Sequence, residues 1–341
     1  MPITKNIARS LAALTLGVTA GTALAGPTLD AINKRGTLVC GVHTGLTGFS
    51  APDKNGKYAG IDVDYCKALA AAILGSPDKV KYVPLTAQQR FTALQSGEID
   101  LLSRNTTWNS KRDTTMGSVF PGVWFFDGQA FVVNSKKNPK VRKLADLNKA
   151  SVCVETGTTT ERNLADYARA NKLTFKPVVF EGQEATEKAF QSGRCDAYTT
   201  DSSGIAAMLV NLPSRADYTV LPEIISKEPL GPMLRRNDQE FFAIMRWMIF
   251  ALQQAEESGV TQANVLQMKA ESKDPTIQRL TGASGEVGKG LGLDADWAVR
   301  AIQAVGNYGE SYDRNIKPLG LTRGMNALWN KGGLMYPMPL D

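Results

Sequence analysis

One segment of the sequence occurs twice and limits the folds open to this chain. Residues 93–100 read Ala-Leu-Gln-Ser-Gly-Glu-Ile-Asp, and residues 189–196 read Ala-Phe-Gln-Ser-Gly-Arg-Cys-Asp. Each copy has the form of a helix end, a glycine turn and the start of a buried strand, since glycine readily closes a helix in the left-handed conformation. We therefore expect two halves of common architecture, which differ in the loop after each copy.

The two loops after the repeated segment carry opposite charges. Residues 103–112 are cationic and rich in hydrogen-bond donors, whereas residues 197–201 end in a carboxylate. In both halves short β-prone runs alternate with helical patterns, which predicts a parallel α/β sheet. Ligands of open α/β sheets bind beyond the carboxyl ends of the strands. We expect the two loops to face one cleft.

The first 25 residues have the pattern of a secretory signal peptide. Lys5 and Arg9 precede an apolar run over residues 11–24, and Ala23-Leu-Ala25 offers a cleavage site with no cysteine after it. The run is shorter than the roughly 20 residues of a membrane span; an uncleaved anchor is the alternative. Cleavage leaves 316 residues and lowers the formal net charge from +6 to +4. This mild charge without a basic run argues against nucleic acid as a partner.

A chain of this length exceeds one hydrophobic core, so two lobes are expected. We predict lobe 1 from residues 26–128 and 232–341, and lobe 2 from residues 129–231. The chain crosses between them near residues 124–133 and 228–233, and two extended crossings form a hinge that bends with limited sliding. The apolar stretch at 241–252 contains Arg246 and is typical of a buried helix, Gln239–Ser258. Asp62 is a plausible N-cap for the helix after Gly60.

The four cysteines are consistent with export to an oxidising compartment. Cys40 and Cys66 lie in the first half, and Cys153 and Cys195 in the second. Pairing within each half is the simplest of three possible connectivities, and the sequence does not decide among them. A zinc site is not expected, because the chain has one histidine and no Cys-x-x-Cys motif.

The two cleft loops together describe a site for an α-amino acid. The Arg112 guanidinium matches a carboxylate in two parallel hydrogen bonds. Asp201 supplies an anion for an ammonium, and Thr107, Thr158 and Thr159 add donors. Charged hydrogen bonds contribute about 1.5–3 kcal/mol each, so a handful of them suits micromolar or tighter binding.

Simpler explanations stand beside each of these assignments. Arg112 next to Asp113 is also the pattern of a surface ion pair, and Asp201 is also placed to cap the helix after it. The Gly-Thr-Thr-Thr turn at residues 157–160 is also the pattern of a plain helix start. No lysine occurs after this glycine at phosphate-loop spacing, which argues against a nucleotide site.

The chain resembles a known family in the order of its motifs: Gly60-Ile-Asp-Val-Asp64, residues 103–112, Gly157-Thr158-Thr159 and residues 196–201. In this order they are similar to the polar amino-acid-binding proteins of bacterial ABC importers. Residues 102–108 and 318–329 are closer still to the general L-amino-acid-binding subfamily. The resemblance implies a two-lobed α/β periplasmic binding protein of type II-like fold, with two hinge strands and a ligand cleft between the lobes. It implies delivery of L-amino acids to an ABC permease with a separate ATPase, by a periplasmic monomer with no cofactor.

The resemblance also implies roles for individual residues. Arg112 corresponds to the arginine that holds the α-carboxylate, and Thr107 and Thr159 match positions that assist it. Asn105 matches a position near the α-amino group, which Asp201 neutralises. The predicted ligand-binding set is Arg112, Asp201, Thr107, Asn105, Thr159, Thr158, Gly157, Arg104, His43 and Phe49.

Three of these positions concern the ligand side chain. His43 falls where related proteins reach toward it, although a solvated loop residue is the alternative. The family's stacking aromatic aligns with Leu46, and Phe49 lies three residues later. Arg104 stands where smaller polar residues are common. If it faces the cleft, it favours Glu, Asp, Gln or Asn side chains.

Two other functions remain compatible with the sequence. A periplasmic dehydratase or lyase on the same fold needs a positioned acid or base, for which Glu155 is the best candidate. That hypothesis requires a perturbed carboxylate at a cleft without the Arg112–Asp201 pair. A ligand sensor that docks on a receptor is the third possibility.

Overall fold

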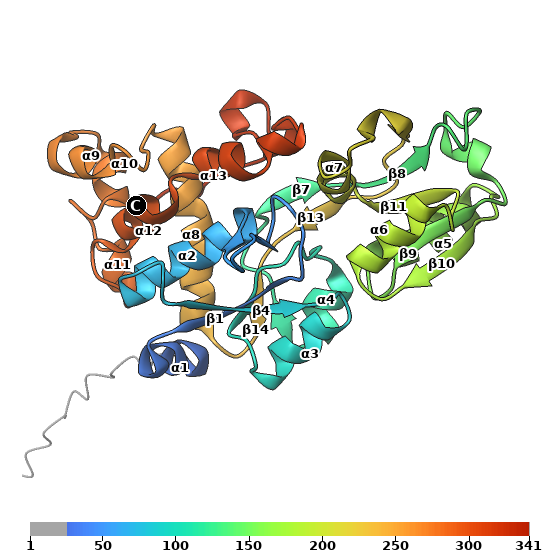
Figure 1. The fold of residues 1–341 in the computed structure, drawn as a ribbon. Coiled ribbons are helices and arrows are strands. Elements are labelled where there is room, and N and C mark those ends of the chain that lie inside the picture. Colours follow the sequence, from blue (N-terminus) through green and yellow to red (C-terminus); the bar gives the residue numbers. More distant parts are fainter. Residues whose placement is uncertain (1–25, 341) are drawn as a thin grey trace, which may run out of the picture.

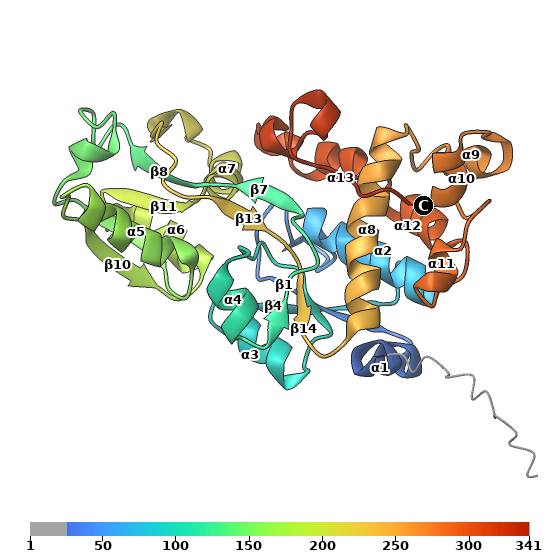
Figure 2. The ribbon, with the colours of Figure 1, turned by 180° about the vertical axis from the view of Figure 1, so that it is seen from behind.

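The computed structural model describes residues 26–340, and the expected signal peptide lies outside this range. The chain forms two lobes that lie side by side and are joined by a pair of extended strands, as two opposite views show (Figures 1 and 2). Each lobe contains one five-stranded sheet. We name the lobes by these sheets.

The lobe 1 sheet is mixed, with the order β4-β1-β5-β14-β6. Its strands are β4 (Val80–Leu85), β1 (Leu38–His43), β5 (Leu101–Leu102), β14 (Met233–Arg235) and β6 (Ser118–Val119), beside a hairpin of β2 (Ala51–Pro52) and β3 (Tyr58–Ala59). β1 runs parallel to β4 and β5, whereas β14 runs antiparallel to β5 and β6. The carboxyl ends of the parallel strands, and the loops after them, therefore lie at one edge of the sheet.

Helices surround the lobe 1 sheet and supply most of its core. They are α1 (Pro27–Arg35), α2 (Ile61–Leu74), α3 (Gln89–Ser96), α4 (Ser110–Thr115), α8 (Gln239–Glu257), α9 (Val265–Glu271), α10 (Pro275–Leu280), α11 (Val287–Gly290), α12 (Trp297–Val305) and α13 (Tyr308–Asn315), with short 3-10 turns at 317–319, 324–326 and 329–331. α12 packs against α2 and α8. Within residues 26–340, α8 included, no helix combines the length and apolarity needed to cross a membrane.

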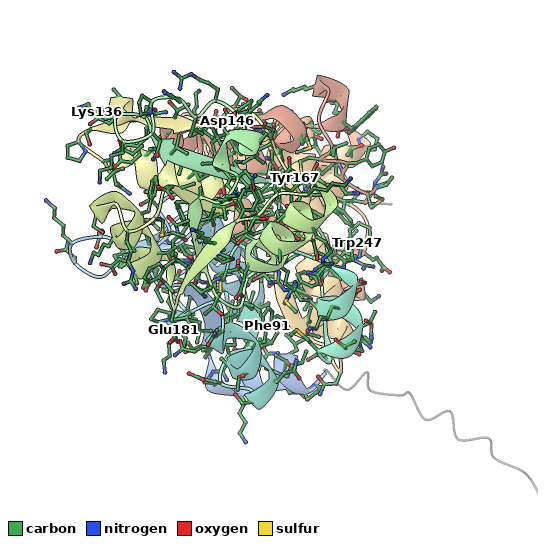
Figure 3. The ribbon with its side chains drawn as sticks, turned by 90° about the vertical axis from the view of Figure 1, so that its right-hand side faces the viewer. Phe91, Lys136, Asp146, Tyr167, Glu181 and Trp247 are labelled. Atoms are coloured by element: carbon green, nitrogen blue, oxygen red, sulfur yellow. A yellow bond between two sulfur atoms is a disulfide. The ribbon has the colours of Figure 1, made fainter. Side chains whose placement is uncertain are left out.

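The lobe 2 sheet repeats the arrangement with the order β10-β9-β11-β8-β12. Its elements are β8 (Gln129–Asn134), η1 (Leu144–Leu147), β9 (Ser151–Glu155), α5 (Thr159–Ala170), β10 (Lys176–Phe180), α6 (Gln183–Ser192), β11 (Ala197–Asp201), α7 (Ser202–Val210), η2 (Arg215–Asp217) and β12 (Tyr218–Val220). One apolar cluster covers each face of the sheet. Figure 3 shows the molecule from the lobe 2 end, with Tyr167 of α5 near the centre.

Two antiparallel strands connect the lobes, as the sequence predicts. β7 (Phe125–Asp127) pairs with β13 (Glu228–Leu230), so that Glu228 lies opposite Asp127. The predicted lobe boundaries fall in the short connections after these strands and stay a prediction. The repeated turns have the expected form, because Gly97 and Gly193 end α3 and α6 with φ of 80° and 86°.

Both disulfides join cysteines of the same half, Cys40 to Cys66 and Cys153 to Cys195. The simplest connectivity is thus confirmed. The predicted cap of α2 is wrong: Gly60 holds that position, with φ 135°, and Asp62 lies in the first turn. The Asp62 carboxylate instead accepts a hydrogen bond from the backbone N–H of Asn105, at 2.9 Å.

Candidate ligand-binding cleft

A small polar cavity lies between the lobes, at the carboxyl ends of their parallel strands. It measures about 20 Å³, which is room for about one water molecule. The lobes are therefore closed on each other. Its lining residues are Arg90, Arg104, Asn105, Thr107, Glu155, Thr158, Thr159, Thr160, Gln183, Thr200 and Asp201. Six of them belong to the predicted set: Arg104, Asn105, Thr107, Thr158, Thr159 and Asp201.

The loop after β5 supplies the lobe 1 wall. Asn105 adopts φ 27°, a left-handed conformation that asparagine tolerates better than most residues. Its backbone N–H is held by Asp62, and burial, more than any other cause, raises the pKa of that carboxyl to about 7. The Oδ1 atom of Asn105 is buried and accepts no hydrogen bond within the described residues. It is an acceptor available to a ligand.

Arg112 is buried behind this wall, on the short helix α4. Its side chain is 2 % exposed, its guanidinium lies 5.1 Å from the centre of the Phe91 ring, and Nη1 donates to the Thr107 carbonyl at 2.8 Å. The alternative of a surface ion pair with Asp113 is therefore wrong. Burial is the main cause that lowers the pKa of Arg112 to about 10, followed by Arg162, and Glu228 and Asp201 act against it. Arg112 itself does not line the small cavity.

The lobe 2 wall is built around the start of α5. The Thr158 hydroxyl accepts from the N–H of Glu161 at 3.1 Å and so caps the helix. Gly157 has φ 75°, and a Cβ there would lie 2.9 Å from the Gln88 side chain of lobe 1. The turn is thus a helix start, as the simpler explanation holds. It is also a contact surface between the lobes, which that explanation does not include.

Asp201 lines the cavity and does not cap helix α7, because the Asp127 carboxylate binds the start of that helix. Asp201 ends β11 and makes no capping bond to α7. Asp127 of the hinge takes that role, since it accepts from the Ser202 hydroxyl and from the Ser203 N–H. Burial, then Asp127 and Glu228, raise the pKa of Asp201 well above its ordinary value. The capping alternative for Asp201 is therefore wrong.

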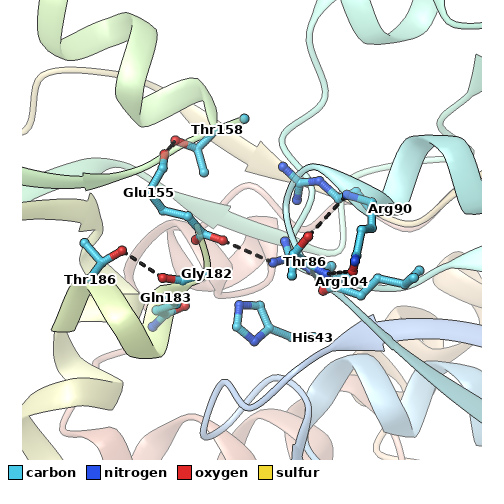
Figure 4. Close-up of polar contacts among 12 residues, drawn as sticks. His43, Thr86, Arg90, Arg104, Glu155, Thr158, Gly182, Gln183 and Thr186 are labelled. Carbon is cyan, nitrogen blue, oxygen red and sulfur yellow. Dashed lines mark hydrogen bonds and ion pairs between the residues drawn. The ribbon is translucent and has the colours of Figure 1, made fainter. Parts of the chain in front are cut away.

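Arg104 faces Glu155 across the cleft (Figure 4). The guanidinium Nη2 lies 3.9 Å from Glu155 Oε1, and Nε donates to the Leu85 carbonyl at 2.8 Å. Glu155 Oε1 is buried and accepts no hydrogen bond from any residue between 26 and 340. Glu155 therefore faces a cationic partner from the other lobe at the cavity that Asp201 also lines, and Arg112 lies behind the lobe 1 wall of this cavity. The dehydratase or lyase hypothesis requires a perturbed carboxylate at a cleft that lacks the Arg112–Asp201 pair, and this arrangement does not meet that requirement.

His43 lies beside Gln183, next to the Arg104–Glu155 pair (Figure 4). It is 2 % exposed, and its Nδ1 accepts from the Gly45 N–H at 3.0 Å. Burial, then Arg104 and Arg90, lower its pKa well below the ordinary value, so the ring is neutral at pH 7. The alternative of a solvated loop residue is wrong. A contact with a ligand stays a prediction.

Phe49 does not line the cavity, which corrects its place in the predicted ligand-binding set. It is fully buried, and its ring meets Phe125 edge-on at 5.1 Å. The loop folds back through a bridge between Leu46 and Ser50. Phe49 is thereby turned into the lobe 1 core.

Sequence reasoning missed several groups around the cavity. Arg90 of α3 is buried there, and Gln183 of α6 lies beside His43. Glu228 is the third, and its carboxylate accepts four hydrogen bonds, from Thr107, Thr159, Asn163 and Ser226. One signal for it was available, because it is the charged residue of the otherwise apolar segment 228–233.

Comparison with known proteins agrees with this architecture. Residues 38–265 match the model of the bacterial extracellular solute-binding proteins, family 3. The chain is 50% identical to the general L-amino acid-binding periplasmic protein AapJ of Rhizobium johnstonii, over 98% of this chain and 99% of the relative. It is 51% identical to the glutamate/glutamine/aspartate/asparagine-binding protein BztA of Rhodobacter capsulatus, over 97% and 96%.

A solved structure has the same fold throughout. It is an ABC transporter periplasmic binding protein from Brucella ovis with glutathione bound, 52% identical, with a TM-score of 0.90 over 92% of this chain and 99% of that chain. Together with the two lobes, the paired hinge strands and the polar cleft between them, these matches assign the chain: it belongs to the bacterial extracellular solute-binding proteins, family 3.

Proposed function

We propose that this protein binds an L-amino acid between its lobes in the periplasm and delivers it to the membrane permease of an ABC importer. The observation that carries the proposal is the placement of Arg112 and Asp201, which are buried on opposite lobes. Asp201 lines the cavity, and Arg112 lies directly behind the lobe 1 wall, where it donates to the carbonyl of the lining residue Thr107. Each influences the pKa of the other. The periplasmic and amino-acid-binding relatives support the location and the ligand class.

Arg112 has the free donors that a carboxylate needs. Within the described residues, its side chain donates one hydrogen bond, to Thr107. A guanidinium carries five N–H donors in a planar fork, so most of them remain for a ligand. The Asp201 carboxylate likewise accepts no hydrogen bond from any described residue. A zwitterion placed between them bridges the lobes and favours the closed state, because it interacts with both lobes only there.

The cross-lobe pair of Arg104 and Glu155 indicates the side chain of the ligand. Arg104 donates and cannot accept, whereas the Glu155 carboxylate accepts and cannot donate. A carboxamide offers one acceptor and two donors, so it satisfies both at once. A ligand carboxylate satisfies Arg104 alone and is repelled by Glu155. We therefore infer that Gln and Asn bind more tightly than Glu and Asp.

Isothermal titration of the purified protein with a panel of L-amino acids tests the main proposal. We expect one site per chain and micromolar or tighter Kd values for several polar amino acids. Glutathione belongs in the panel, because the Brucella ovis relative binds it. Absence of binding to every amino acid would overturn the proposal.

The ratio of the Kd values for Glu and Gln tests the ligand class. One charged hydrogen bond is worth about 1.5–3 kcal/mol, so we expect a ratio of about 10 to 100 in favour of Gln. Glu155→Gln should bring this ratio close to one or reverse it, because the new amide donates to a ligand carboxylate. Glu181→Gln is the matched control, since Glu181 is exposed at the rim of the cleft. A Glu155→Gln variant with the wild-type ratio contradicts the inference.

A further inference from the structure

Glu228, on the hinge strand β13, gathers hydrogen bonds from both lobes onto one carboxylate. Its Oε2 accepts from the hydroxyls of Thr107 and Thr159, at 2.5 and 2.9 Å. Its Oε1 accepts from Asn163 Nδ2 at 2.8 Å and from the Ser226 hydroxyl at 2.6 Å. The side chain is 1 % exposed. All four acceptor directions of a buried charge are thus occupied, as buried carboxylates require.

The donors come from different sides of the cleft. Thr107 belongs to the lobe 1 loop after β5, whereas Thr159 and Asn163 belong to α5 of lobe 2. We propose that Glu228 is a positioning residue that clamps the closed state, so that ligand binding and lobe closure are coupled through it. This inference rests on the proposed function, because it concerns the same cleft.

The bonds to lobe 2 are the ones that opening breaks. The Thr107 segment is attached to β13 by its backbone, since Thr107 bridges to Leu230 and the Trp108 N–H donates to the Pro229 carbonyl at 2.7 Å. Glu228 and Thr107 therefore stay together when the hinge bends. Separation of the lobes removes Thr159 and Asn163 from Glu228, and closure restores both bonds.

The same hydrogen bonds determine whether two hydroxyls of the cavity act as donors or as acceptors toward a ligand. A threonine hydroxyl has one hydrogen to donate and otherwise accepts. The hydroxyls of Thr107 and Thr159 donate this hydrogen to Glu228, so they present lone pairs to the cavity that they line. They then accept from a ligand ammonium, and only their backbone N–H groups remain for the ligand carboxylate. This revises the carboxylate-binding role that the resemblance implies for their side chains.

One effect of Glu228 opposes closure, namely its repulsion of the neighbouring carboxylate Asp201. This repulsion is weakened by burial, which raises the pKa of Asp201 and so favours its neutral form over its charged form. The four hydrogen bonds to Glu228 persist in either case. We therefore expect the loss of Glu228 to favour the open state.

Stopped-flow binding of L-glutamine to the full chain tests the clamp. Glu228→Gln keeps the size of the side chain but removes the charge and turns part of the acceptor into a donor. We expect the dissociation rate constant to rise about tenfold to a hundredfold, because one or two charged hydrogen bonds weaken in the closed state. The association rate constant should stay within about twofold, since encounter occurs in the open state. Glu223→Gln is the matched control, because Glu223 accepts a hydrogen bond from the Leu144 N–H of its own lobe and, among the described residues, makes none to lobe 1.

Two further measurements separate this inference from the proposed function. Asn163→Ala removes one lobe 2 donor and should raise the dissociation rate in the same direction, which also covers a Glu228→Gln variant that fails to fold. Small-angle X-ray scattering of the ligand-free protein should give a larger radius of gyration for Glu228→Gln than for wild type. If wild type binds amino acids and neither dissociation nor radius changes, the clamp is overturned while the proposed function stands. If wild type binds none, the radius alone decides on the clamp.

Discussion

Replacement of Arg112 by Met should remove the binding of every amino acid. The guanidinium is expected to hold the α-carboxylate, which all L-amino acids share, through two charge-assisted hydrogen bonds. At about 1.5–3 kcal/mol each, their loss amounts to about 3–6 kcal/mol. With about 1.4 kcal/mol for each factor of ten, Kd rises roughly 100-fold to 10,000-fold. A micromolar ligand would then bind in the range of about 0.1 to 10 mM.

Two control variants separate this role from a general effect. Lys111→Met makes the same change in charge at the exposed neighbouring position and should leave Kd unchanged. Arg112→Lys keeps the charge but loses the planar fork, so an intermediate loss is expected. Because Arg112 also donates to the Thr107 carbonyl, thermal unfolding of each variant shows whether the fold persists.

Isothermal titration with Gln, Glu, Ala and Leu distinguishes the possible outcomes. A parallel loss for all four ligands supports the assignment of Arg112 to the α-carboxylate. Loss of Glu binding alone would mean that Arg112 reads the side chain and that the arrangement of the site is misassigned. A folded Arg112→Met variant whose Kd values stay within about tenfold of wild type would refute the reasoning altogether.

Three predictions concern stability and are checked by urea unfolding. Burial raises the pKa of Asp62 to about 7, so the folded state holds a proton that the unfolded state loses near pH 4. The free energy of unfolding should fall between about pH 4 and 7, and Asp62→Asn should remove up to about 4 kcal/mol of this fall; an unchanged profile contradicts the shift. Removal of the Cys153–Cys195 disulfide should cost about 2–4 kcal/mol, and no loss would refute a stabilising role. Gly60→Ala, at φ 135° and with a backbone oxygen 2.1 Å from the new Cβ, should cost about 1–3 kcal/mol or more, whereas Gly45→Ala should be neutral.

The parts of the fold that depend on local chemistry could be predicted from the sequence. The helix that ends at Gly97 and the one that ends at Gly193 are coded by apolar periodicity and by a glycine in the left-handed conformation. The long helix α8 begins at the predicted Gln239 and ends one residue before the predicted end. Each of these features depends on residues that lie close to it in the sequence.

The parts of the site that depend on contacts between distant segments could not be predicted in this way. The sequence offers Asp201 as a cap for α7, but Asp127, 74 positions earlier, takes that role through the pairing of the hinge with lobe 2. The sequence suggests Phe49 as an aromatic residue of the cleft, but the bridge between Leu46 and Ser50 directs its ring into the lobe 1 core. Glu228 shows no role until Thr107 and Thr159 are brought to it from separate lobes.

The state of Asp201 explains how closure can depend on a ligand. In the closed cleft, burial and the nearby carboxylates raise the pKa of Asp201 well above its ordinary value, so its charged form is disfavoured there. The ammonium of an amino acid reverses this, because an adjacent cation favours the charged form. Arg112 is affected in the opposite sense, since burial lowers its pKa and a ligand carboxylate raises it. A zwitterion therefore serves both groups, because its ammonium favours the charged form of Asp201 and its carboxylate favours the charged form of Arg112. A ligand with only one of the two groups compensates one charge and leaves the other buried without a partner, which costs several kcal/mol. Amines and carboxylic acids that lack the second group should thus fail to close the lobes, even where their side chains match Arg104 and Glu155.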